Sequence, residues 1–344
     1  MRLVLGLLLL ALSLAVDARR GVEAGEPFAA RPQYASFLQS LAAETSLALE
    51  DLDRVFRQVI IRPQIVRAIS MPAEAKPWDQ YRPLFVNQRH ISGGLAFWDL
   101  HAEALRRAWQ TYGVPEAVIV AILGVETHYG RHTGGYRVLD ALTTLAVDYP
   151  PRADYFRREL VEFLLLAREQ GLNTLAVKGS YAGAMGIGQF MPSSCRKYGV
   201  DFDGDGQADL WRNPIDAIGA VANYLHAFGW QPGAPIAYPV QVAGEATREL
   251  ANTGWSARRP LREWRSRGVT IGEHVPEELE AMLIRLDTTQ GPEFWLAFQN
   301  YYVITRYNRS FQYALAVHQL AQALTSARLT ACSACRLDAI VSPQ

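Results

Sequence analysis

One glutamate stands out because of the segment that carries it. Glu126 lies near the end of residues 115–130, which read PEAVIVAILGVETHYG. Pro115 suits the first turn of a helix, where the missing N–H of proline costs nothing. The Val, Ile, Leu and Ala that follow leave no polar face, which is typical of a buried helix. The segment therefore predicts a buried helix with Glu126 close to its C-terminal end.

The position of Glu126 indicates what this residue could do. Apolar surroundings and the negative end of the helix dipole both disfavour an ionised carboxylate, so we expect the pKa of Glu126 to be raised. A carboxylic acid that stays protonated near neutral pH can protonate the leaving oxygen of a glycosidic bond. A solvated glutamate at a helix end is the plain alternative, and one residue alone does not decide between the two.

A glycine-rich segment follows at residues 178–194, KGSYAGAMGIGQFMPSS. It lacks the GK[ST] ending of a phosphate-binding loop and the strand-to-helix pattern of a dinucleotide site. Its glycines permit close backbone approach, which also suits a tight helix-packing segment. Ser180 and Gln189 are neutral hydrogen-bonding groups beside Tyr181, Phe190 and Met191. This mixture of neutral polar groups and flat apolar faces suits a sugar.

Two further patterns could bind a ligand. Residues 300–308, NYYVITRYN, hold several aromatic side chains, and Tyr224 adds another, although such residues more often belong to a core. The loop DFDGDGQAD from Asp201 places carboxylates at the first, third and fifth positions and Gly206 at the sixth, as in a calcium-binding EF-hand. Arg212 replaces the glutamate expected at position twelve, but Asp216 could close an enlarged loop. A solvated acidic turn is the alternative.

Residue patterns also outline the elements that must position these groups. Apolar residues at helical spacing predict helices within residues 34–56, 95–112, 153–170, 214–228 and 311–324. Composition changes at residues 231–233, QPG, and short apolar runs such as residues 281–286 then predict strands in a small β module. We expect these parts: signal peptide 1–18, α-helical accessory domain 27–114, catalytic core 115–237, β module 238–298, a helical segment 299–326 that returns to the core, and a tail 327–344.

The ends and the composition bound the possible classes of protein. Residues 1–18 carry one Arg and then a short apolar run, which predicts a secretory signal peptide. No Cys stands at the cleavage point, so we expect an exported protein without a lipid anchor. Lys plus Arg and Asp plus Glu both number 34, which argues against nucleic acid as a partner. Cys332 and Cys335 suit a local disulfide more than zinc or redox chemistry, and Cys195 suits a small buried side chain.

Taken together, these motifs resemble the lytic murein transglycosylase B family. The resemblance rests on VETHYGRHTG from Val125, YPPRADYF from Tyr149, the glycine-rich segment, the acidic loop, DAIGAVANYL from Asp216 and NYYVITRYN. It runs in order from Tyr34 to Ala323. It implies a mainly α (α+β) fold: a goose-lysozyme-like helical core, an N-terminal α-helical domain and a small inserted β domain.

The family also implies an activity and a site. Its members cleave the β-1,4 bond between N-acetylmuramic acid and N-acetylglucosamine in peptidoglycan without water, which leaves 1,6-anhydromuramoyl ends. Glu126 would be the single acid and base, with no cofactor for the chemistry and a structural Ca²⁺. The glycan strand would contact Ser180, Tyr181, Met185, Gln189, Tyr224, Tyr301 and Tyr307. The calcium ligands would be Asp201, Asp203, Asp205, Gln207 and Asp216.

Two other functions remain open from the sequence. A hydrolytic muramidase on the same fold would need a second carboxylate that positions water, and a non-catalytic peptidoglycan-binding protein would have no use for Glu126. We expect a soluble periplasmic monomer that acts on glycan strands. The sequence leaves open whether cell-wall synthases are partners, and whether cleavage starts at chain ends.

Overall fold

The computed structural model describes residues 25–71 and 76–341, with side chains described as far as residue 330. The expected signal peptide at 1–18 and the side chains of Cys332 and Cys335 lie outside this range. The described chain forms two compact units. The helical unit comprises residues 25–71 and 126–220, and the sheet unit comprises residues 76–125 and 221–341. The division falls inside two helices, α7 and α11, which contribute to both units.

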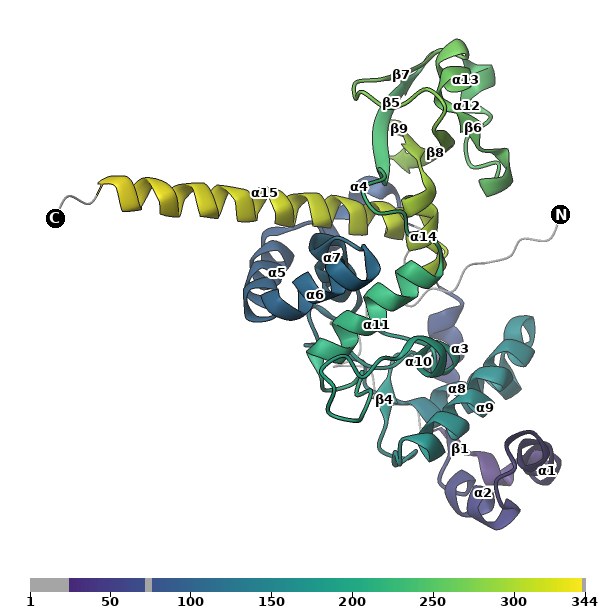
Figure 1. Cartoon of the computed structure of the whole chain (residues 1–344). Coiled ribbons are helices and arrows are strands. Elements are labelled where there is room, and N and C mark those ends of the chain that lie inside the picture. Colours follow the sequence, from purple (N-terminus) through teal and green to yellow (C-terminus); the bar gives the residue numbers. More distant parts are fainter. Residues whose placement is uncertain (1–24, 72–75, 342–344) are drawn as a thin grey trace. The chain divides into compact units, whose positions relative to one another are not determined.

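The helical unit consists of short helices and two-stranded pairings (Figure 1). Its elements are β1 (Glu26–Pro27), η1 (Phe28–Ala30), α1 (Tyr34–Thr45), α2 (Leu49–Phe56), β2 (Ile60–Ile61), α3 (Pro63–Ile69), β3 (Tyr136–Arg137), α8 (Val138–Asp148), η4 (Pro150–Arg152), α9 (Ala153–Glu169), β4 (Lys178–Gly179) and α10 (Pro192–Tyr198), with the first half of α11 (Pro214–Ala227).

A buried carboxylate fixes the middle of the helical unit. Asp140 on α8 is fully buried and forms ion pairs with Arg62 at 2.9 Å and with Arg137 at 2.8 Å. It also accepts a hydrogen bond from the Ile60 backbone N–H. Because Ile60 and Arg62 lie in the β2–α3 segment whereas Arg137 lies just before α8, the single aspartate joins two stretches of chain that are distant in sequence. A buried charge satisfied in this way is costly to disrupt.

The sheet unit is built around five antiparallel strands in the order β6-β8-β9-β5-β7. Its elements are α4 (Trp78–Tyr81), η3 (Arg82–Leu84), α5 (Gln88–Leu100), α6 (Ala102–Tyr112), most of α7 (Glu116–Thr127), the end of α11, β5 (Ala237–Val242), α12 (Glu245–Arg248), η5 (Trp255–Ala257), β6 (Arg259–Pro260), α13 (Leu261–Ser266), β7 (Val269–Ile271), β8 (Glu280–Thr288), β9 (Gly291–Ala297), α14 (Gln299–Tyr307) and α15 (Phe311–Val341).

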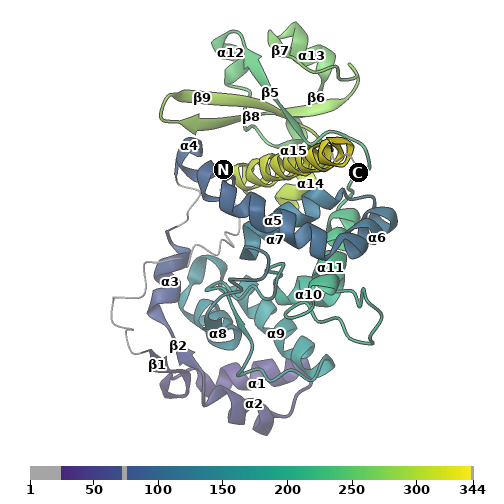
Figure 2. The ribbon, with the colours of Figure 1, turned by 90° about the vertical axis from the view of Figure 1, so that its left-hand side faces the viewer.

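Both faces of the sheet are covered, and successive buried residues of β8 therefore pack on opposite sides. On one face, Trp264 of α13 packs into a cluster with Leu283 and Leu296, and its indole N–H donates to the Ala281 carbonyl oxygen. On the other face, Ile284 is fully buried where α4 and α15 pack on β8. Figure 2 shows α12 and α13 above the sheet and α15 below it.

The observed elements confirm the predicted mainly helical fold with a small β module. The predicted helix at 153–170 is α9, the helix at 214–228 is α11, and the strand at 281–286 is part of β8. Two predictions differ from the structure. Residues 27–114 are divided between the two units, because α3 packs on α8 whereas α5 packs on α15. The domain boundaries drawn from the sequence are therefore not those of the compact units.

The second difference concerns the end of the chain. We predicted a separate tail after residue 326, but α15 continues without a break to Val341. Residues 325–341 contain neither proline nor glycine, so nothing in them interrupts the helix. By length and hydropathy, no single helix of the described chain suffices to cross a membrane; the bent pair α6 and α7 reaches that threshold only when the two are counted together.

Candidate active site

Glu126 lies in the last turn of α7, as the sequence predicted. The helix is apolar on all sides, and Ile119, Ala121 and Leu123 are fully buried. The side chain of Glu126 is 2% exposed. A carboxyl group with so little contact with solvent is unusual, since such groups are rarely buried without a structural or chemical reason. The predicted rise of its pKa stays a prediction.

The chain turns sharply immediately after Glu126. His128 and Tyr129 have φ angles of 51° and 63°, in the left-handed region that bulky residues rarely adopt. Thr127 stabilises the turn, because its hydroxyl donates to the Ile187 carbonyl oxygen at 2.7 Å and accepts from the Gly130 N–H at 2.8 Å. Backbone strain of this kind is concentrated at functional sites. Burial raises the pKa of the Tyr129 hydroxyl, so Tyr129 stays neutral.

The glycine-rich segment lies against this turn within the helical unit. Gln189, itself at φ 50°, donates through its side-chain amide to the carbonyl oxygens of Thr133 and Gly186. The glycines are required where the backbone is close: a Cβ on Gly179 would lie 2.1 Å from the Ala184 oxygen, and one on Gly186 would lie 2.4 Å from the Leu210 oxygen. The helical unit thus brings Glu126 and the glycine-rich segment together.

The predicted sugar-binding residues of this segment differ in exposure. Tyr181 is partly exposed. Ser180 is 6% exposed, and its hydroxyl accepts a hydrogen bond from the Ala184 N–H. Met185 is fully buried, and its backbone pairs with Gly179 on one side and Phe190 on the other. The prediction that Met185 lines an open groove therefore does not match its place in this structure.

The predicted aromatic residues of α11 and α14 belong to the sheet unit. Tyr224 packs edge-on against Tyr307, with ring centroids 5.0 Å apart, and its hydroxyl donates to the Arg306 carbonyl oxygen at 2.6 Å. Tyr301 is fully buried, and its hydroxyl donates to the Phe311 carbonyl oxygen. Burial raises the pKa of Tyr301 well above its usual value. Tyr301 is thus a core residue, which corrects its predicted place in the groove, and the partly exposed tyrosine beside it is Tyr302.

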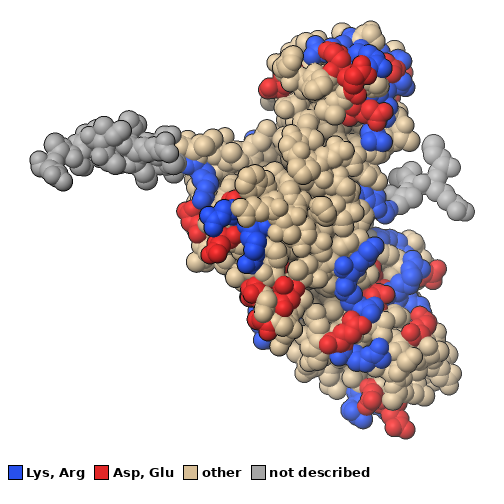
Figure 3. All heavy atoms as spheres, in the orientation of Figure 1, with Lys and Arg blue, Asp and Glu red and all other residues tan. Residues whose placement is uncertain are grey.

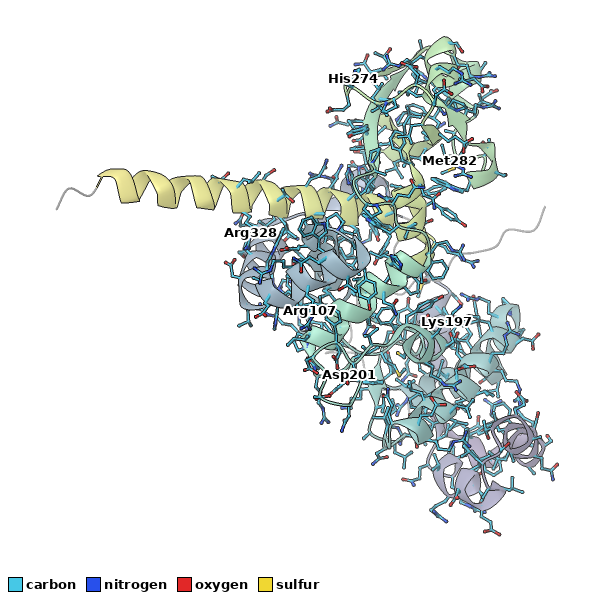
Figure 4. The ribbon with its side chains drawn as sticks, viewed as in Figure 1. Arg107, Lys197, Asp201, His274, Met282 and Arg328 are labelled. Carbon is cyan, nitrogen blue, oxygen red and sulfur yellow. The ribbon has the colours of Figure 1, made fainter. Side chains whose placement is uncertain are left out.

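The acidic loop gathers three of the predicted metal ligands. Asp201, Asp203 and Asp216 each offer an oxygen, and these atoms lie within 4.8 Å of one another. Asp216 is fully buried and accepts from the backbone N–H groups of Phe202 and Asp209, and burial raises its pKa. Figure 4 shows Asp201 on the loop before α11. Clustered carboxylate oxygens, one of them buried, fit a hard divalent cation such as Ca²⁺.

The other two predicted ligands, Asp205 and Gln207, also lie in this loop. The Asp205 carboxylate accepts a hydrogen bond from the Gln207 N–H, and Asp205 is not among the three clustered carboxylates. Gly204 and Gly206 have φ angles of 81° and 95°, which the tight turn of the loop requires.

Three other carboxylates of the helical unit have structural partners. Asp140 pairs with two arginines as described above, and Asp148 pairs with Arg31 at 3.0 Å. Glu159 accepts hydrogen bonds from the backbone N–H and hydroxyl of Ser193, and burial raises its pKa. Cys195 is buried, as predicted, and burial raises the pKa of its thiol, so it is a poor nucleophile.

Comparison with known proteins identifies the family. A buried glutamate beside a segment with neutral polar and aromatic groups suits an enzyme that cleaves glycans, since these enzymes use a carboxyl group as the acid. Residues 29–322 match the family described as the transglycosylase SLT domain. The chain is 41% identical over 318 residues to membrane-bound lytic murein transglycosylase B of Escherichia coli (strain K12), which covers 90% of this chain and 87% of that protein. The chain therefore belongs to the lytic murein transglycosylase B family, and it is a lytic transglycosylase.

Solved structures agree with this assignment. The soluble lytic transglycosylase SltB1 from Pseudomonas aeruginosa is 48% identical, with a TM-score of 0.79 over 86% of this chain and 99% of that chain. Escherichia coli Slt35 in complex with calcium is 40% identical, with a TM-score of 0.81 over 91% of this chain and 99% of that chain. The predicted fold class is therefore confirmed.

Relatives have also been solved with small molecules that bear on the site. Slt35 was crystallised with bulgecin A as well as with calcium. SltB3 from Pseudomonas aeruginosa, 33% identical with a TM-score of 0.76 over 85% of this chain and 79% of that chain, was solved in complex with NAG-anhNAM-pentapeptide.

Proposed function

We propose that this chain cleaves the β-1,4 bond between N-acetylmuramic acid and N-acetylglucosamine in peptidoglycan and leaves a 1,6-anhydromuramoyl end. The observation that carries this proposal is Glu126, a buried carboxyl group at the end of an apolar helix and beside a strained turn. SltB3 was solved in complex with NAG-anhNAM-pentapeptide, a ligand that contains an anhydro sugar, and this complex supports the same chemistry.

Glu126 acts as both acid and base in the proposed mechanism. Its protonated carboxyl group gives a proton to the leaving glycosidic oxygen, and the C1–O4 bond breaks. The carbonyl of the muramoyl 2-acetamido group stabilises the positive charge that develops at C1. The carboxylate of Glu126 then takes the proton of the C6 hydroxyl as that oxygen bonds to C1. Acid and base are one residue at two moments, as microscopic reversibility allows.

The surroundings of Glu126 favour this route over hydrolysis. An inverting or retaining hydrolase needs a second carboxylate near the bond. In the helical unit, Asp140, Asp148 and Glu159 are each engaged in ion pairs or hydrogen bonds within the fold. None of these three is therefore available to position water without loss of a structural contact.

The first experiment compares products from the wild type and a Glu126→Gln variant. Purified protein digests peptidoglycan, and mass spectrometry weighs the soluble muropeptides. We expect products one water lighter than hydrolysis products from the wild type and at least about a 1,000-fold loss in the variant, since general acid and base catalysis both depend on this group. Glu116→Gln is the matched control, because Glu116 lies at the other end of α7, where its carboxylate accepts a hydrogen bond from the Trp98 indole N–H.

Each other outcome has a definite meaning. Hydrated reducing ends would show a muramidase with an unrecognised second group. Substantial cleavage by the Glu126→Gln protein would remove Glu126 from the mechanism. Glycan binding without products from the wild type would favour a binding protein.

The remaining predicted sites belong to the same proposal. The glycan strand contacts Tyr181 and the polar groups of Ser180 and Gln189, and the tyrosines Tyr224 and Tyr307 are further proposed contacts. A structural Ca²⁺ binds to the acidic loop through Asp201, Asp203, Asp205, Gln207 and Asp216, which is supported by the calcium complex of Slt35. The metal takes no part in the bond cleavage.

The protein works in the periplasm as an exported monomer without a lipid anchor. Support for export comes from the pattern of residues 1–18, in which no cysteine occurs. The Escherichia coli relative is named membrane-bound, so the anchor is the point to test. Metabolic labelling with a fatty acid and fractionation of cells expressing the full chain would show an unlabelled, soluble periplasmic protein. Label in the protein would contradict the proposal.

A further inference from the structure

A stack of aromatic rings and one arginine runs through the sheet unit. The rings of Trp255 and Tyr302 are stacked, with centroids 4.7 Å apart and planes at 16°. The guanidinium carbon of Arg306 lies 5.8 Å from the Tyr302 ring centroid and 5.6 Å from that of Phe228. We call these four residues the ring–arginine stack; they come from η5, α14 and the residue after α11.

The guanidinium group of Arg306 has no counter-charge in the part of the chain that the structure describes. Arg258, which also lies near Trp255, pairs with Glu280, and Arg259 pairs with Glu263. Arg306 is partly buried, yet its guanidinium N–H groups make no ion pair or hydrogen bond with the described residues. Arg306 therefore differs from Arg258 and Arg259, which also contact rings but have acidic partners.

The contacts of Arg306 with the two rings suit the binding of one kind of ligand, a carboxylate. A guanidinium group stacks through its flat faces, and its N–H donors point outward in its own plane. Two parallel donors in a plane match the two oxygens of a carboxylate, and a bidentate pair of this kind is among the stronger hydrogen-bonded contacts. Contact with two rings also restricts the side chain, which reduces the entropy lost on binding.

We propose that Arg306 binds a carboxylate of the peptide stem of peptidoglycan and makes the protein prefer peptide-bearing glycan over bare glycan. The inference rests on the proposed function. In intact peptidoglycan the lactyl carboxyl group of each peptide-bearing muramic acid is bound in an amide to the peptide, so the free carboxylates of those units are carried by the peptide. Arg306 precedes Tyr307 in the chain, and its carbonyl oxygen accepts the Tyr224 hydroxyl. The proposed peptide contact thus lies directly beside two proposed glycan contacts.

Binding is tested first, with a readout that does not depend on cleavage. Probes are a synthetic stem pentapeptide, the same peptide with every carboxylate converted to an amide, and inorganic phosphate. Calorimetric titration should detect binding of the acidic peptide to the wild type. The amidated peptide should bind at least about tenfold more weakly, since a charge-assisted pair of hydrogen bonds is lost. Arg306→Gln should remove this difference between the two peptides. Arg306→Lys keeps the charge but lacks the planar pair of N–H donors, so this variant should show only part of the difference in affinity between the two peptides.

Arg309→Gln is the matched control for the change in charge. Arg309 is exposed, lies three residues further along the chain and takes no part in the ring–arginine stack. The Arg309→Gln protein should bind the acidic peptide as the wild type does. Melting temperatures of all variants show whether the fold is intact, so a loss through misfolding is recognised.

Cleavage is tested second, on intact peptidoglycan and on glycan strands from which an amidase has removed the peptides, a step that leaves a lactyl carboxylate on each muramoyl residue but none of the carboxylates of the peptide. Arg306→Gln should lower kcat/KM about tenfold on intact material and less than about twofold on stripped strands. An equal loss on both substrates, or none on either, would overturn the proposal. Phosphate binding as tight as that of the acidic peptide would also overturn it, because the site would then be a general anion site. If the wild type cleaves nothing, the proposed function fails while the binding result still stands.

Discussion

Three carboxyl groups of this protein are buried in different surroundings. Glu126, Glu159 and Asp216 are carboxyl groups with little or no exposure, but their neighbours differ. Glu159 and Asp216 accept backbone and side-chain hydrogen bonds that fix loops, whereas Glu126 ends an apolar helix. Burial alone therefore does not mark a catalytic acid. What distinguishes Glu126 is its place at the end of an apolar helix and beside a strained turn.

His318 makes the stability of the protein sensitive to acid. It is buried on α15, and loss of hydration lowers its pKa from 6.5 to about 4, although a hydrogen bond to the Ala237 backbone opposes the shift. Because the pKa is depressed in the folded state, the unfolded chain binds more protons between these values, and stability is lost as pH falls below 6.5. Between pH 7 and pH 5 this residue should cost about 2 kcal/mol of the free energy of unfolding.

Urea unfolding at pH 7 and pH 5 measures that cost. The wild type should lose more stability over this range than a His318→Gln variant, by about 2 kcal/mol. His274→Gln is the control, because His274 is exposed on the loop after β7, where Figure 4 shows it, and the variant should match the wild type. An identical loss in the His318→Gln protein would contradict the prediction.

Elements were predictable where their patterns are local. The apolar run of α7 and the short strands of the β module follow directly from residue type and spacing, and both are present. The end of α15 was not predicted, because residues 325–341 contain neither proline nor glycine and no local signal marks where the helix ends. The full burial of Met185 and Tyr301 was not evident from the sequence, because residue type alone does not tell which apolar or aromatic side chains of a motif face the core. Tyr302 and Arg306 lie in the same motif, but only packing reveals which of its side chains remain accessible.

The acidic loop gives a prediction at the scale of one element. If it binds Ca²⁺, excess ion should raise the melting temperature by several degrees, since a ligand at 100 times its dissociation constant adds about 2.7 kcal/mol. EDTA should leave cleavage largely intact, because the ion lies outside the proposed chemistry. Asp203→Asn should abolish most of the shift, whereas Asp209→Asn should retain it, because the Asp209 carboxylate caps the backbone N–H groups of Trp211 and Arg212 instead.

Differential scanning calorimetry with and without 5 mM Ca²⁺, about the concentration that would saturate a weak extracellular site, makes the test. Mg²⁺ serves as the ion control. A melting temperature that does not change in excess Ca²⁺ would favour a solvated acidic turn.

The whole molecule carries no excess of charge. Acidic and basic residues are equal in number, and Arg2 and Asp17 of the expected signal peptide cancel, so processing leaves the balance unchanged. Figure 3 shows blue and red side chains interspersed over the sheet unit, where Arg265 pairs with Glu277 and Arg267 pairs with Glu263. A molecule of this kind is not steered by long-range attraction to an anionic wall.

Salt should therefore affect cleavage only weakly. Between 50 and 300 mM NaCl, the initial rate of muropeptide release should change less than about twofold, because added ions screen long-range fields that this protein lacks. The rate is followed by chromatography of the soluble products. A steep fall with salt would show that local charge on one face dominates the encounter, contrary to the expectation.

The strained turn beside Glu126 has a consequence for how this protein can change. His128, Tyr129 and Gln189 occupy a backbone region that glycine enters freely, at a cost of about 1 kcal/mol or more for each bulky residue. Substitution by glycine would relieve this strain, but at Gln189 it would also remove the two hydrogen bonds to Thr133 and Gly186 and leave a void, because the side chain is buried. Strain and stabilising contacts are held by the same side chains, so a population selected for heat resistance alone has no simple substitution that removes the costly conformation.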